Sequence, residues 1–178
     1  YMLIGNFLKN IKKEFKNHQF AGLSFNSEDC KKDYIFFAIK GTKSDGSKFI
    51  DHAIKKGAKV IISEQKFEGI KNKVLFLRSK NVRKILSELS YKIKKNIPKN
   101  LIGVTGKNGK SSIADFYFQL LNLGNKKVAS IGTLGIKTKN NLKKVSNTTL
   151  DPIGLSKILN DLKKQKIDNV IMEASSHG

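Results

Sequence analysis

The sequence has few of the features that mark secreted, membrane-spanning or disulfide-rich proteins. Cys30 is the only cysteine, so no intrachain disulfide can form, and a single thiol fits a reducing cytoplasm. The longest apolar or aromatic runs are about six residues, well below the ~20 that span a bilayer. The N-terminus also lacks the charged-then-apolar order of a secretion signal. These absences predict a cytoplasmic protein with no transmembrane helix and no membrane partner.

Arginine is scarce as well, which limits what the high positive charge can mean. The chain has 35 Lys and Arg against 14 Asp and Glu, a formal net charge of +21, yet only Arg78 and Arg83 are arginines. Arginine is the preferred residue for bidentate contacts with bases and phosphates, and the lysines are spread through the whole chain. The charge therefore indicates a solvated lysine surface that favours anionic ligands, and we predict no specific nucleic-acid partner.

The order of apolar and amphipathic segments predicts an α/β fold. At 178 residues and 39% hydrophobic content, the chain can form one large core or two small ones. Runs rich in Ile, Val and Phe predict strands, and apolar residues at helical spacing predict helices. In the first half the predicted strands are 21–27, 33–41, 58–64 and 74–79, and the predicted helices are 49–57 and 82–95. His52 is interpreted as a residue on the face of the first helix.

A domain boundary is expected near Pro98, because a buried-looking strand begins soon after it. The predicted domains are 1–97 and 98–178. The second alternates strands and helices, at 100–105, 110–123, 127–136, 152–164 and 169–174. This alternation predicts a parallel sheet covered on both faces, and the polar stretch after the third element predicts an exposed loop or short hairpin.

The segment GVTGKNGKSS, residues 103–112, carries the strongest chemical signal. It satisfies the phosphate-loop pattern of Gly, four residues and Gly-Lys-Ser, between a predicted strand and a predicted helix. In that context the loop amides and the positive helix end converge where a triphosphate can lie. We expect Lys110 to neutralise the β- and γ-phosphates and Ser111 to offer its hydroxyl to Mg²⁺. The predicted ATP-binding residues are Gly103, Thr105, Gly106, Lys107, Asn108, Gly109, Lys110, Ser111 and Ser112.

A carboxylate is expected on the same side of the sheet. Glu173 ends the predicted strand in NVIMEASSHG, and the C-terminal ends of parallel strands form the ligand side of such sheets. There it could hold Mg²⁺ directly or through water. The predicted catalytic residues are therefore Lys110 and Glu173, and the predicted metal-binding residues are Ser111 and Glu173.

Four separate motifs resemble those of the Mur ligases of peptidoglycan synthesis, most closely the MurE branch. They are GVTGKNGKSS, SIGTLGI at 130–136, NTTLDP at 147–152 and MEASSHG at 172–178. The segment from about Gly22 onward also resembles the uridine-nucleotide-binding domain of that family. It departs from the family pattern at Asn26, Glu28 and Ser47, where Asp, Arg and His are usual, and at Lys107, where Thr is usual.

The resemblance implies a fold, a reaction and substrates. The fold would be a small α/β UDP-binding domain followed by the first part of a P-loop NTPase-like parallel-sheet domain. The reaction would be ATP- and Mg²⁺-dependent addition of a third, diamino acid to UDP-MurNAc-L-Ala-D-Glu, in cell-wall synthesis, by a protein that is a monomer at full length. Ser27 would contact the UDP moiety. The muramoyl-dipeptide would be held by Asn147, Thr148, Thr149 and Ser175.

Members of the family have three domains, so we expect this chain to be a truncated piece that cannot complete ligation. The sheet of its second domain would then be unfinished, with a strand edge or apolar face uncovered. MurF and folylpolyglutamate-type ligases remain alternatives within the class. A phosphate-loop NTPase that binds nucleic acid remains the alternative from another class.

Overall fold

The protein, described here by a computed structural model, divides into two compact units. The first is Tyr1–Ile93 and the second is Lys94–Gly178. The structure describes residues 1–41, 45–94, 96–144 and 150–174. Within these ranges no helix is both long enough and apolar enough to cross a membrane.

The first unit is built on a five-stranded sheet in the order β3-β4-β5-β7-β6. Strands β3 (Gly22–Ser24), β4 (Tyr34–Phe37), β5 (Val60–Ser63) and β7 (Val74–Arg78) fall in the four ranges where strands were predicted, and they run parallel to one another. An antiparallel edge strand, β6 (Gly69–Lys71), and a small pair, β1 (Met2–Leu3) with β2 (Gln19–Phe20), were not expected from the sequence. The 3-10 helices are η1 (Ile4–Asn6), η2 (Lys13–Phe15), η3 (Ser27–Asp29) and η4 (Gly46–Phe49).

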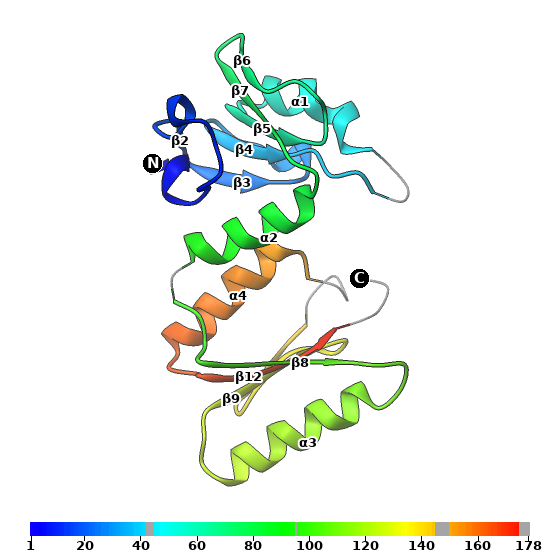
Figure 1. The fold of residues 1–178 in the computed structure, drawn as a ribbon. Coiled ribbons are helices and arrows are strands. Elements are labelled where there is room, and N and C mark those ends of the chain that lie inside the picture. Colours follow the sequence, from blue (N-terminus) through cyan, green and yellow to red (C-terminus); the bar gives the residue numbers. More distant parts are fainter. Residues whose placement is uncertain (42–44, 95, 145–149, 175–178) are drawn as a thin grey trace. The chain divides into compact units, whose positions relative to one another are not determined.

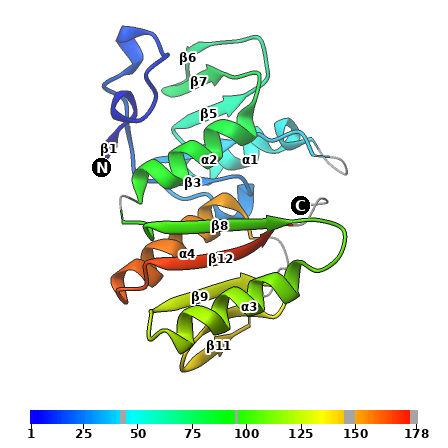
Figure 2. The same cartoon turned by 60° about the horizontal axis from the view of Figure 1, so that its bottom comes forward.

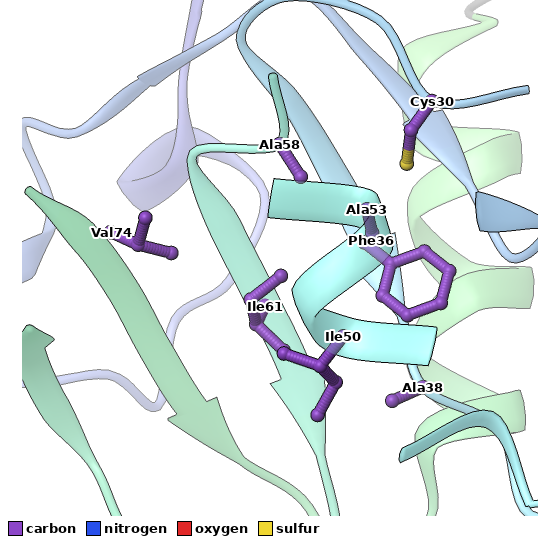
Figure 3. Close-up of a cluster of buried hydrophobic side chains, with 8 residues drawn as sticks. All are labelled: Cys30, Phe36, Ala38, Ile50, Ala53, Ala58, Ile61 and Val74. Carbon is purple, nitrogen blue, oxygen red and sulfur yellow. The ribbon is translucent and has the colours of Figure 1, made fainter. Parts of the chain in front are cut away.

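Helices α1 (Ile50–Lys55) and α2 (Val82–Ile93) lie on opposite sides of this sheet (Figure 1). Alternate strand residues such as Phe36 and Ile61 pack with Ile50 and Ala53 of α1 in a buried cluster (Figure 3). The intervening residues are also buried, because α2 contacts β4 on the other side. Both faces of the sheet are thus covered, which explains why its strands read as continuous apolar runs.

The second unit has a five-stranded sheet in the order β11-β10-β9-β12-β8 (Figure 2). Strands β8 (Asn100–Thr105), β12 (Asn169–Ala174) and β9 (Val128–Gly132) are parallel. Helix α3 (Lys110–Leu123) lies on one face and α4 (Pro152–Lys164) on the other. Helix α4 begins at Pro152, and the preceding Asp151 caps it by accepting a 2.9 Å hydrogen bond from the amide of Gly154.

The prediction of one strand over 127–136 and of a wholly parallel sheet is wrong. The chain reverses after Gly132, and β10 (Gly135–Thr138) pairs antiparallel with β9 and with β11 (Asn141–Lys143). The reversal depends on Gly135, whose φ of +116° is unfavourable for other residues and where a β-carbon would overlap the carbonyl of Lys143. The described part of the polar stretch that follows completes a short hairpin of β10 and β11, one of the two forms predicted.

Strands β11 and β8 form the two edges of the second sheet in the described part of the chain. Leu101 and Ile102 on β8 are each 38% exposed. Four exposed apolar residues also follow one another at helical spacing along α3, namely Ile113, Phe116, Leu120 and Leu123. We call these four residues the outer stripe of α3, since the residues facing the sheet are Ala114 and Phe118.

Candidate functional site

The phosphate-loop segment connects the C-terminal end of β8 to the first turn of α3. Its two inner glycines have positive φ angles, +154° at Gly106 and +79° at Gly109, so both need the conformational freedom of glycine. Gly109 directly precedes α3, and Thr105 ends β8. The loop therefore turns the backbone sharply and presents the free amides of the first helical turn to solvent.

The side chain of Lys110 lies back over this loop. Its Nζ donates hydrogen bonds to the carbonyl of Gly106 at 2.6 Å and to the carbonyl of Lys107 at 3.4 Å. The loop residues from Thr105 to Gly109 are exposed, and so are the next two hydroxyl residues, Ser111 and Ser112. A cation, exposed backbone amides and two exposed hydroxyl residues therefore gather at the start of α3, and such a set suits a polyphosphate.

Glu173 lies beside this loop although it is 62 residues from Ser111 in the sequence. Parallel pairing of β12 with β8 places Glu173 opposite Val104, just before the loop begins. The hydroxyl of Ser111 donates a 2.9 Å hydrogen bond to Oε2 of Glu173. The structure thus brings together the two residues that the sequence suggested as metal ligands.

The chemistry of these two groups fits Mg²⁺. The ion takes oxygen ligands and is usually held by one or two carboxylates together with phosphate oxygens and water. Ligands at roughly 2.0–2.1 Å in an octahedron are about 2.9 Å apart when adjacent, which matches the spacing of Ser111 Oγ and Glu173 Oε2. The part of the chain that the structure describes holds no cluster of three His, Cys, Asp or Glu residues.

The first unit has its own cavity, of about 750 Å³. Ser27, the residue suggested for the UDP contact, lines this cavity and is largely buried. It begins the 3-10 helix η3, which Asn26 caps by accepting a 3.1 Å hydrogen bond from the amide of Glu28. The lining residues are Phe25, Asn26, Ser27, Glu28, Ile39, Gly41, Gly46, Phe49, His52 and Arg83.

Two cavity residues were missed by sequence reasoning, His52 and Arg83. His52 Nδ1 lies 3.0 Å from Ser27 Oγ, and its Nε2 lies 3.9 Å from Oε1 of Glu28. Lys56 approaches the other oxygen of Glu28 at 3.4 Å. His52 therefore does more than occupy a helix face, and the ammonium of Lys56, directly after α1, lies beside the Glu28 carboxylate. No sequence signal connects these residues, because the fold alone brings them together.

Four of the predicted substrate residues cannot be placed. Asn147, Thr148, Thr149 and Ser175 lie outside the described residues. Their roles stay predictions.

A phosphate loop between a parallel strand and a helix, with a carboxylate on the neighbouring strand, defines the second unit as a phosphate-loop nucleotide-binding fold. Comparison with known proteins is more specific. Residues 104–178 match the Mur ligase middle domain, and residues 19–94 match the catalytic domain of the Mur ligase family. The chain belongs to the Mur ligase family.

Individual relatives point to one branch of this family. The chain is 41% identical over 173 residues to the UDP-N-acetylmuramoyl-L-alanyl-D-glutamate–2,6-diaminopimelate ligase of Rickettsia prowazekii, covering 95% of this chain and 36% of the relative. A solved structure of a ligase with that name superposes with a TM-score of 0.81 at 28% identity, covering 99% of this chain and 36% of that one. The chain therefore spans about a third of the length of the relatives it matches.

A more distant solved structure shares the fold. The MurF ligase of Thermotoga maritima, solved in complex with ADP, matches with a TM-score of 0.54 at 24% identity, over 86% of this chain and 32% of that one.

Proposed function

We propose that this chain forms the nucleotide-binding portion of an ATP-dependent ligase that joins 2,6-diaminopimelate to UDP-MurNAc-L-Ala-D-Glu. The names of its relatives support this substrate pair. The observation that carries the proposal is the 2.9 Å contact between Ser111 and Glu173 beside the phosphate loop. This contact gives the chain a place for a triphosphate and its metal ion at one end of the sheet.

The proposed reaction joins two anionic reactants before an amine attacks. The terminal carboxylate of the dipeptide attacks the γ-phosphorus of ATP, which releases ADP and forms an acyl phosphate. The amine then attacks the acyl carbon, releasing phosphate and a proton and forming the amide. Lys110 and the first-turn amides of α3 offset the repulsion between carboxylate and triphosphate. When bound by Ser111 and Glu173, Mg²⁺ would neutralise further phosphate charge.

The cavity of the first unit suits the uridine nucleotide. Phe25 and Phe49 are 40% and 44% exposed at its lining, so each offers a ring face to a base. Arg83 offers a guanidinium to a diphosphate. Replacing Arg83 with Ala should weaken UDP binding by roughly tenfold, the loss of about one charge-assisted hydrogen bond.

Arg78 provides a matched control, since it is the other arginine and does not line the cavity. UDP binding to each variant of this chain can be measured by isothermal titration calorimetry. Equal affinities in Arg83→Ala and Arg78→Ala would place the uridine nucleotide elsewhere.

The activity itself is tested by phosphate release from the full-length protein. We expect release only when ATP, the UDP-linked dipeptide and diaminopimelate are all present, with loss of activity in Glu173→Gln. Lysine in place of diaminopimelate tests the amino-acid choice. Phosphate release that needs no amino acid but rises with DNA or RNA would contradict the ligase and favour the nucleic-acid-binding NTPase.

A further inference from the structure

The last residue of β9, Gly132, lies against the side chain of Glu173. Strand β12 pairs in parallel with β9, with Met172 opposite Ile131, so Glu173 comes next to Gly132 along the same register. A β-carbon built on Gly132 would overlap Oε1 of Glu173 and lie 2.8 Å from its Cδ and 3.3 Å from its Cγ. The space that a side chain would occupy at position 132 is therefore filled by the Glu173 carboxylate.

Backbone conformation does not explain this glycine. Gly132 is not among the glycines with positive φ, whereas Gly135, three residues later, has φ of +116° and serves the turn. An L-residue could adopt the backbone of position 132, so the requirement there is for space alone. The two glycines of the segment SIGTLGI are thus required for different reasons. Gly135 permits the turn of the hairpin, and Gly132 leaves space for the Glu173 side chain.

The position of the Glu173 carboxylate is defined from two sides. Oε1 lies against the backbone of Gly132, and Oε2 accepts the 2.9 Å hydrogen bond from Ser111. A methyl group at position 132 would push the carboxylate away from β9. Because a glutamate side chain is flexible, it would move without unfolding the sheet, but it would leave the position that faces Ser111.

We propose that Gly132 is a positioning residue for the Mg²⁺–nucleotide site, because it leaves room for the Glu173 carboxylate to lie within reach of Ser111. This inference rests on the proposed function, in which Ser111 and Glu173 hold the metal ion. Groups that orient a metal ligand typically change metal affinity by roughly 10–100-fold when they are altered. We therefore expect Gly132→Ala to raise the Mg²⁺ concentration needed for half-maximal ATP binding by about tenfold or more.

The test is a Mg²⁺ titration of this chain at a fixed concentration of a fluorescent ATP analogue. Gly124→Ala is the matched control, because Gly124 has an ordinary φ of −74° and a β-carbon there would meet nothing closer than 3.5 Å. We expect Gly132→Ala to shift the Mg²⁺ midpoint while its affinity in EDTA and its melting temperature stay close to those of Gly124→Ala. Shortening the acid in Gly132→Ala/Glu173→Asp should restore part of the Mg²⁺ response.

The outcomes separate the two proposals. If wild-type binding does not depend on Mg²⁺, or Glu173→Gln leaves the midpoint unchanged, the proposed metal site fails. If Glu173→Gln shifts the midpoint but Gly132→Ala behaves like Gly124→Ala, the positioning role is overturned while the site stands. Loss of folding in Gly132→Ala alone would make the glycine a packing residue and would also overturn the positioning role.

Discussion

Removing the ammonium of Lys110 is the sharpest perturbation of the phosphate loop. In the structure this group lies 2.6 Å from the Gly106 carbonyl, at the centre of the loop, and a bound phosphate would meet it there. A pair of unit charges 4 Å apart interacts by about 1 kcal/mol in water and about 4 kcal/mol near a protein surface. For this partly covered lysine we expect Lys110→Ala to cost about 3 kcal/mol, or roughly 100-fold in ATP affinity.

The assay is calorimetric or fluorescent titration of this chain with ATP and Mg²⁺. Lys126→Ala is the control, since it removes the same charge beyond the opposite end of α3. Circular dichroism is used to check that both variants are folded. In the full-length protein, Lys110→Ala should reduce turnover by a similar factor or more. A folded Lys110→Ala chain that binds ATP within threefold of the Lys126→Ala control would refute the assignment of the loop.

Three further predictions concern stability and the chain's own competence. Leu159 of α4 is fully buried, so Leu159→Ala should lower the free energy of unfolding by about 2–5 kcal/mol in urea titrations. Leu120→Ala, in the outer stripe of α3, should change the free energy of unfolding by under about 0.5 kcal/mol. Equal losses of stability in Leu159→Ala and Leu120→Ala would contradict the packing described for the second unit. Asp115 accepts hydrogen bonds from Lys137 and, with a smaller effect, from Gln119, and these bonds lower the pKa of Asp115. The ionised Asp115 therefore stabilises the folded chain fully above the ordinary Asp pKa of about 3.9, and this stabilisation is lost as the pH falls through the lowered pKa. The melting temperature of Asp115→Asn should therefore fall less between pH 5 and pH 2 than that of wild type. This chain alone should yield no tripeptide product by mass spectrometry, because ligation needs all reacting groups aligned within about 3–3.5 Å. Detection of the product would show that the functional unit is smaller than proposed.

The features that could be predicted from the sequence are those encoded by short contiguous segments. The phosphate loop is contiguous, and its glycines, lysine and serine have fixed roles at fixed spacing. The strand before the loop and the helix after it could therefore be predicted from the sequence. Glu173 was placed correctly on the sheet because the C-terminal ends of parallel strands share an edge. These inferences need only local periodicity and one topological rule.

The features that sequence reasoning missed depend on contacts between distant segments. The break between β9 and β10 was hidden because Ile136 reads in the sequence as a continuation of the apolar run of β9, and the residues between the two strands carry no Pro or Asn-Gly signal. His52 and Ser27 are 25 residues apart, and no rule of sequence spacing predicts their contact. The crowding of Gly132 by Glu173 likewise becomes visible only when β9 and β12 lie side by side.

The edge strand β8 and the outer stripe of α3 have a consequence for handling this chain in solution. A strand edge that pairs with no other described strand and, separately, a row of exposed Phe and Leu side chains are each a template for self-association. The net charge of +21 opposes such association by mutual repulsion between copies. Salt shortens the range of that repulsion from about 10 Å at 0.1 M to about 3 Å at 1 M. The chain should therefore stay dispersed in dilute buffer and form oligomers as ionic strength rises, the reverse of a protein held together by ion pairs.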